Sequence, residues 1–166
     1  MTAAQAREHA AWAAIAAVPD PELPALTLCD LGIVREVRTC GDGLEVVLTP
    51  TYSGCPATEF IEDSVREALA RAGMEEVTVT RQLSPAWTTD WISEEGQRKL
   101  LEYGIAPPGP ASQASSGVIR IRPRQLKCPR CGSADTERLS AFGSTACKAL
   151  HRCLSCLEPF EHFKPI

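Results

Sequence analysis

The sequence predicts an α+β fold, in which a small α/β domain with a short mixed sheet and helices is followed by a cysteine-rich β-hairpin module. Three observations support this prediction. Apolar residues recur at helical spacing in some segments and alternate in others. A stretch rich in proline, serine and glycine lacks either pattern, and two Cys-x-x-Cys pairs follow it. We therefore expect a domain over 1–106, a linker over 107–126 and a second domain over 127–166.

The first domain is expected to begin with an amphipathic helix over 3–18, which Pro19 ends. Two alternating runs, 33–39 and 44–49, flank a glycine-containing turn and predict a β-hairpin. The helix at 3–18 would bury a stripe of small side chains: Ala10, Ala13, Ala14, Ala17 and Val18.

A second helix is predicted over 56–72, with Gly73 at its end. A third strand is expected over 77–83, and a last helix from Ser93 to Gly104. The apolar side of the second helix would consist of Phe60, Ile61, Val65, Ala68 and Leu69.

The composition is that of a packed soluble protein, with 44% hydrophobic and 23% charged residues. No apolar stretch reaches the roughly 20 residues needed to cross a bilayer. The alanine-rich N-terminal run lacks the basic segment of an export signal. We therefore expect a cytoplasmic protein in which the eight cysteines are ligands, reactive groups or buried thiols rather than disulfides.

Charge is divided unevenly along the chain. Residues 1–106 hold 8 Lys and Arg against 17 Asp and Glu, whereas residues 107–166 hold 9 against 4. A basic half can indicate nucleic-acid binding, but it contains no basic run interleaved with aromatic residues. We expect a solvated basic surface or a face for an acidic partner, with no nucleic acid and no membrane among the partners.

The cysteine pairs of the second domain give the strongest signal. Cys128 and Cys131 form one pair, Cys153 and Cys156 the other, and 21 residues with strand character at both ends separate them. A hairpin brings two such turns together around one tetrahedral ion, which predicts a zinc ribbon. Iron in the same thiolate cage and disulfides are less favoured. Cys147 is expected to be a buried hydrophobe, and two complete pairs leave no vacancy for a histidine.

Cys55 directly precedes Pro56, which suits the first position of a helix. There the free backbone N–H groups would favour a thiolate, although Glu59 and Glu62 would oppose it. By these residues alone a buried structural cysteine is about as well supported. Cys29 and Cys40 have no motif around them and are expected to be structural.

Three motifs, residues 20–24, 30–34 and 49–56, resemble in order and spacing the MIP18 (DUF59) domain found in iron–sulfur assembly proteins. Further segments are similar to the PaaD family, small accessory proteins of the bacterial phenylacetyl-CoA epoxidase (ring 1,2-phenylacetyl-CoA monooxygenase) system. These segments are 82–91, 104–108, 142–150 and 157–160.

The resemblance implies a role in maturing or supporting that oxygenase in phenylacetate degradation, and no catalysis by this chain. The implied partners are the oxygenase, with its di-iron centre, and the reductase, with its [2Fe–2S] cluster. A lone thiolate cannot cage a cluster, so a homodimer, other ligands or the client would supply the rest. The residues that the resemblance assigns to cluster handling are Asp20, Glu22, Asp30, Thr51 and Cys55.

Two other functions stay open at this point. The chain could be a structural adaptor of the oxygenase complex that docks through its zinc ribbon. A nucleic-acid-binding ribbon is disfavoured by the acidic first domain.

Overall fold

The computed structural model describes residues 2–52, 54, 56–109 and 126–166, which divide into two compact units. The first unit runs to Trp87 and includes Trp91–Gly96, and the second contains Thr88–Asp90 and Gln97–Ile166. The division lies ahead of the boundary expected after residue 106. Most of the expected linker, 110–125, lies outside the described residues.

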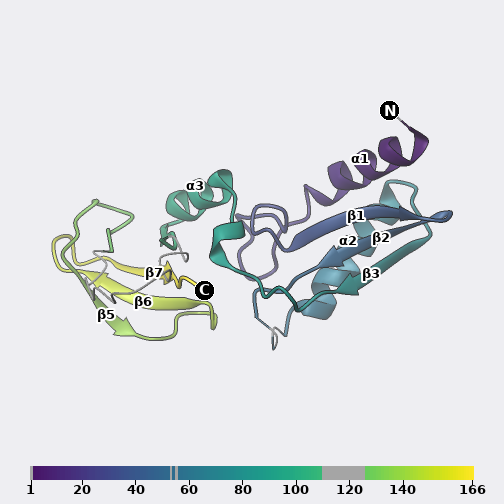
Figure 1. Cartoon of the computed structure of the whole chain (residues 1–166). Helices are drawn as coiled ribbons and strands as arrows, with labels where there is room; N and C mark the ends of the chain where they lie inside the picture. The colour runs from purple at the N-terminus through teal and green to yellow at the C-terminus, as the bar shows by residue number, and fades with distance from the viewer. Residues whose placement is uncertain (1, 53, 55, 110–125) are drawn as a thin grey trace, which may run out of the picture. The chain divides into compact units, whose positions relative to one another are not determined.

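The first unit contains a three-stranded mixed sheet of order β1-β2-β3 (Figure 1). β1 and β2 form the expected antiparallel hairpin, and β3 pairs in parallel with β2. The parallel pair requires a crossover, which the second helix provides. The elements are α1 (Ala3–Ile15), β1 (Val34–Cys40), β2 (Gly43–Leu48), α2 (Thr58–Arg71) and β3 (Val77–Arg81).

Helix α1 begins with a capping box, in which the hydroxyl of Thr2 and the amide of Gln5 each accept the other residue's backbone N–H. The expected apolar stripe of this helix was wrong except at Val18, which is buried just beyond the helix end. Ala10, Ala13 and Ala17 are exposed, and the buried residues are Ala11 and Ile15. Alanines lie on all sides of this helix, and of its two large apolar side chains Ile15 is buried whereas Trp12 is half-buried.

Helix α2 buries Ile61, Val65 and Leu69 as expected, but Phe60 is 62% exposed. The helix begins at Thr58, two residues later than predicted, and its N-cap is Ala57.

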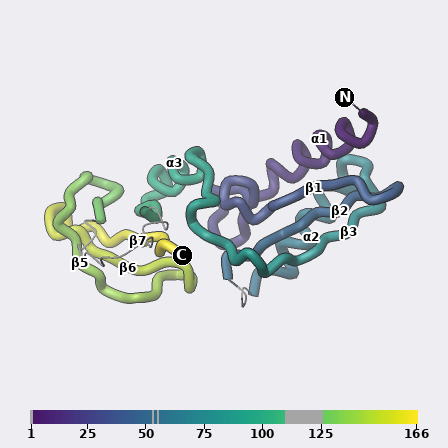
Figure 2. The backbone as a smooth tube through the Cα atoms, viewed as in Figure 1, coloured from purple at the N-terminus to yellow at the C-terminus, as the bar shows by residue number. Residues whose placement is uncertain are grey.

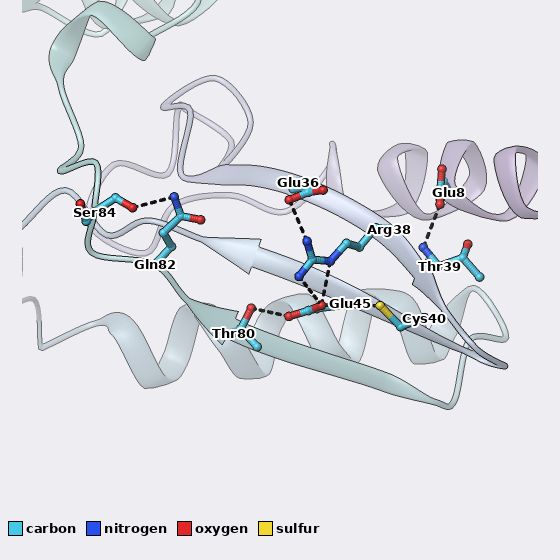
Figure 3. Close-up of polar contacts among 9 residues, drawn as sticks. All are labelled: Glu8, Glu36, Arg38, Thr39, Cys40, Glu45, Thr80, Gln82 and Ser84. Atoms are coloured by element: carbon cyan, nitrogen blue, oxygen red, sulfur yellow. Dashed lines mark hydrogen bonds and ion pairs between the residues drawn. The ribbon is translucent and has the colours of Figure 1, made fainter.

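The open face of the sheet carries an ion-pair network in which Glu45 accepts from Arg38 at 2.8 Å (Figure 3).

The chain after β3 folds back on the loop ahead of β1. The indole N–H of Trp87 donates to the Leu31 carbonyl at 2.8 Å, and the guanidinium of Arg35 lies 3.6 Å from the ring centre of Trp91. Gly32 has φ +68°, and a Cβ there would lie 2.6 Å from the Trp91 carbonyl oxygen.

A short 3₁₀ turn, η1 (Thr89–Trp91), leads to α3 (Glu94–Glu102). Ser93 caps α3 as expected.

The second unit contains a four-stranded sheet of order β4-β7-β6-β5. Strands β5 and β6 form the expected antiparallel hairpin. The sequence did not predict β7 or the short β4, which pairs with β7 in parallel. The α+β fold with a hairpin module is therefore confirmed. The strands are β4 (Ile105–Ala106), β5 (Thr136–Ser140), β6 (Lys148–Cys153) and β7 (Pro159–Phe163).

A buried ion pair crosses the second sheet. Nζ of Lys148 lies 2.8 Å from a carboxylate oxygen of Glu161, and the side chain of Lys148 is 4% exposed. The other oxygen of Glu161 accepts the N–H of Ser144 at 2.6 Å. A Cβ at Gly143 would lie 2.5 Å from that oxygen, so a larger residue there would displace the carboxylate from its present position.

Candidate metal centre

The structure brings the four predicted cysteines of the second unit together. Their sulfur atoms all lie within 4.8 Å of one another. Sγ of Cys128 is 3.8 Å from that of Cys156, and Sγ of Cys131 is 3.5 Å from that of Cys153. Each close pair therefore joins one Cys-x-x-Cys turn to the other.

These separations fit a tetrahedral thiolate site. With Zn–S bonds of about 2.3 Å, neighbouring sulfurs of a tetrahedron lie about 3.8 Å apart. A disulfide would instead require about 2.05 Å. The residues present thus suit a closed four-thiolate metal site, and no sulfur pair among them is within bonding distance.

The two cysteine turns have matching backbone geometry. The N–H of Cys128 donates to the Ser133 carbonyl at 2.9 Å, and the N–H of Cys153 donates to the Glu158 carbonyl at 3.0 Å. In both turns the residue after the second cysteine has a positive φ, +75° at Gly132 and +63° at Leu157. Leucine at such a position is strained, whereas glycine is not.

Backbone donors point at the sulfurs. The N–H of Arg130 donates to Sγ of Cys128 at 3.4 Å, and the N–H of Cys156 donates to Sγ of Cys153 at 3.5 Å. The donor from Cys156, followed by one from Ser155, lowers the pKa of Cys153 to about 6. Hydrogen bonds to the charged form favour it, so this sulfur is a ready thiolate ligand.

For Cys156 the N–H of Glu158 lowers the pKa, but partial burial and the neighbouring sulfurs outweigh it and raise the pKa to about 12. The sulfurs are too close for all four to ionise without a cation. A bound divalent ion would reverse this balance.

The other cysteines and histidines of this unit lie outside the sulfur group. Cys147 is buried, with its sulfur 3.0 Å from the Thr145 hydroxyl, as its expected structural role requires. His151 packs edge-on against His162, with ring centres 5.6 Å apart. Burial, together with nearby Arg138, lowers the pKa of His151.

The motif residues of the first unit lie in loops around the sheet. Oδ1 of Asp20 accepts the N–H groups of Glu22 and Leu23 at 2.9 and 2.8 Å. Oδ2 of Asp30 accepts the N–H of Thr27 at 2.9 Å. Both carboxylates are buried and thus fix the loop that leads into β1.

The loop before β1 and the loop after β2 lie at the same end of the sheet, opposite the hairpin turn (Figure 2). Val34, which opens β1, pairs with Leu48, which closes β2. The N–H of Thr49 donates to the Ile33 carbonyl at 2.8 Å, which joins the two loops directly. Thr51 is half-buried in the second of these loops, and Cys55 lies outside the described residues.

Charged groups near the start of α2 and at the end of β3 form an ion pair, and Arg81 of this pair lies beside Leu48 at the end of β2. Glu62 in the first turns of α2 is buried and forms an ion pair with Arg81 at the end of β3. The hydrogen bond from Arg81 lowers the pKa of the Glu62 carboxyl despite its burial. Arg81 therefore offsets the negative charge of Glu62, which was expected to oppose a thiolate at Cys55.

Two residues gain significance from the structure. The Thr49 hydroxyl is buried and has no hydrogen-bond partner within the described residues, a feature that spacing could not reveal. Cys29 is half-buried, and burial and then Asp30 raise the pKa of its thiol, which fits its expected structural role.

Two family models match the chain in separate segments. Residues 8–80 match the family described as iron–sulfur cluster assembly protein, and residues 113–164 match the PaaD zinc beta ribbon domain. An Escherichia coli protein named as a putative subunit of 1,2-phenylacetyl-CoA epoxidase is 49% identical over 165 residues, which cover 99% of this chain and 97% of that protein. The chain belongs to the PaaD family.

Other proteins are similar to this chain over its first unit alone. A Porphyromonas gingivalis protein named Fe-S protein maturation auxiliary factor is 36% identical over 53% of this PaaD-family chain and 82% of its own length. A crystal structure of a DUF59 domain from Bacillus anthracis has a TM-score of 0.55 and 27% identity, over 58% of this chain and 93% of that domain. The MIP18 (DUF59) resemblance is thereby confirmed. No helix within the described ranges is long and apolar enough to span a membrane.

Proposed function

We propose that this PaaD-family chain is a cytoplasmic, non-catalytic accessory factor that helps mature the iron–sulfur components of a phenylacetyl-CoA epoxidase. Its partners would be the oxygenase and reductase of that system. The names of its relatives support this, since one is called an epoxidase subunit and another an Fe-S protein maturation factor.

The observation that carries the proposal is that the loop before β1 and the loop after β2 are joined at the open end of the β1–β2 hairpin. The direct bond from Thr49 to Ile33 links the loop that Asp20 and Asp30 fix to the loop that contains Cys55. This link between the loop that holds Asp20 and Asp30 and the loop that begins at Thr49 supports the proposal.

In this proposal Cys55 holds iron or a cluster as cargo. A single thiolate binds iron only weakly, and weak binding permits transfer to a client. Asp20 and Asp30 position the loop, while the half-buried Glu22 and Thr51 are the residues that would contact the cargo or the client. The client or a second copy of the chain supplies the remaining ligands.

The second unit would hold a structural zinc ion at Cys128, Cys131, Cys153 and Cys156. The sulfur separations and the backbone donors support this assignment. When bound, zinc would stabilise a unit whose hydrophobic core around the cysteines is small.

The test replaces Cys55 with serine in cells that express the whole epoxidase system. Cys40→Ser is the matched control, because Cys40 is an exposed cysteine at the hairpin turn, at the opposite end of β1. We expect Cys55→Ser to abolish epoxidase activity and deplete iron and sulfide in the reductase, while Cys40→Ser leaves both unchanged. A fully loaded reductase and active epoxidase in the Cys55→Ser strain would refute a cluster-handling role.

A structural adaptor is the second candidate, and exposed apolar side chains on the second unit favour it. In this case Cys55→Ser would leave epoxidase activity unchanged, whereas Cys128→Ser would release the chain from the oxygenase complex in a co-purification experiment. The exposed side chains are Leu139, Phe142, Leu154 and Leu157.

A further inference from the structure

The second unit contains a cavity of about 930 Å³ beside the cysteine turns. All of its described lining residues belong to this one unit. Ligand pockets for small molecules typically have volumes of about 300–1,000 Å³. Much of the lining is apolar: Leu101, Ala106, Pro107, Leu126, Pro129, Ala149 and Pro165.

One face of the four-stranded sheet forms the floor of this cavity. His162 pairs with Ala106 on one side and with Ala149 on the other, so these three side chains share a face. His151 pairs with Arg138 across the β5–β6 ladder and lies on the same face, two residues from Ala149. The two imidazoles therefore stand next to each other on an otherwise apolar floor.

The charged side chains around the cavity are basic, apart from the Cys128 thiolate that the metal-loaded protein would hold at its border. Lys127, Arg138 and Lys164 line it, and no carboxylate does so within the described residues. Neither Lys127 nor Arg138 forms an ion pair with a described residue. Nζ of Lys164 donates to the Ala141 carbonyl at 3.3 Å and lies 4.6 Å from the ring centre of Phe142. An anion in the cavity would therefore find cations that no described carboxylate neutralises.

We propose that this cavity binds a small organic anion with an apolar body, such as an acyl or aryl group that carries a carboxylate, sulfonate or phosphate. The apolar body would lie over Ala149 on the sheet and against Leu101 of α3, and the anionic group would contact Arg138, Lys127 or Lys164. Hydrophobic burial and charge complementarity act together in such a site. The motif loops of the first unit would take no part, and among the four sulfur ligands only Cys128 borders the cavity.

The probe is 1-anilinonaphthalene-8-sulfonate, an aryl sulfonate whose fluorescence rises in apolar surroundings, titrated into the full-length zinc-loaded protein. We expect saturable binding that octanoate displaces and octanol, its uncharged counterpart, does not. A second competition with octanoyl-coenzyme A distinguishes a free acid from a carrier thioester as the better ligand. Either result supports the proposal.

Two variants locate the binding. Arg138→Gln should weaken binding of the probe about fivefold, since an exposed ionic contact is lost. Leu101→Asp adds a negative charge at an exposed lining position, and we expect it to weaken binding further. Arg152→Gln is the control, because Arg152 is a neighbouring exposed arginine that does not line the cavity and pairs with Glu137. Zinc content and circular dichroism establish that each variant is folded.

Several outcomes would overturn the proposal. One is an absence of saturable binding by folded protein, and another is equal displacement by octanol and octanoate. Wild-type affinity in Arg138→Gln would also contradict it. Displacement by polyglutamate but by neither octanoate nor octanoyl-coenzyme A would assign the surface to an acidic protein instead.

Discussion

The buried ion pair between Lys148 and Glu161 should be essential for the stability of the second unit. Glu161→Gln keeps the shape of the side chain but leaves the Lys148 ammonium, 4% exposed, without a carboxylate. Breaking a buried pair in this way costs about 3–5 kcal/mol. Because the Glu161 side chain is 22% exposed, we expect a loss near the lower limit, about 3 kcal/mol.

Thermal unfolding of the zinc-loaded protein, followed by circular dichroism at pH 7, measures this loss. A loss of that size lowers the melting temperature of a unit of this size by about 12–24 °C. The matched control is Glu137→Gln, which removes an exposed pair with Arg152 and should cost about 0–1 kcal/mol. The double variant Lys148→Met with Glu161→Gln removes both charges and should recover most of the stability.

The same pair makes a prediction about pH. Burial raises the pKa of the Glu161 carboxyl, but the hydrogen bonds from Lys148 and Ser144 outweigh it and hold the pKa below its usual value. A carboxyl with a lowered pKa stabilises the fold above its unfolded pKa of about 4.3, and this contribution is lost as the pH falls through the folded value. The stability difference between the wild type and Glu161→Gln should therefore shrink below that pH. Equal stability of the two proteins at pH 7 would refute the argument.

Three further predictions concern two glycines, the hydrogen bond from Trp87 to the Leu31 carbonyl, and the metal. Gly73→Ala should lower the free energy of unfolding in urea by about 1 kcal/mol, since its φ is +78° and its surroundings are open. Gly32→Ala should lower it by a multiple of that amount, because its Cβ would also collide with Trp91. Equal costs would contradict the collision. Trp87→Phe leaves the Leu31 carbonyl without its donor and should cost about 1–3 kcal/mol in the same assay. Chelation should abolish hydrogen-exchange protection of the second unit and leave that of the first, and unchanged protection of both would show that no metal supports the fold.

The local elements of this fold could be predicted because local patterns determine them. The hairpin of β1 and β2 follows from alternation around a glycine turn, and the cap of α3 from Ser93. The four-cysteine group followed from spacing alone, since each Cys-x-x-Cys turn positions two sulfurs.

Features that depend on distant partners could not be predicted. β4 has two residues, and only its pairing with β7 makes it a strand. The buried face of α1 was missed because its alanines fit either side of the helix. Nothing in the sequence around Lys148 indicated that Glu161 would neutralise it.

The contact between the two motif loops was not predicted from the sequence. The sequence resemblance identified two loops, and only the register of β1 against β2 placed Ile33 beside Thr49. The unpartnered hydroxyl of Thr49 is likewise a property of three-dimensional packing.

The matching geometry of the two cysteine turns determines where this family can tolerate insertions. A metal at the four sulfurs closes a loop of chain between the turns, and the entropy of closure rises by only about 0.6 kcal/mol for each doubling of loop length. Strands β5 and β6 carry that loop away from the sulfurs and back again. Relatives can therefore lengthen the connection between these strands at little cost to metal affinity, whereas a single residue added inside either cysteine pair would misdirect the N–H groups that face the sulfurs.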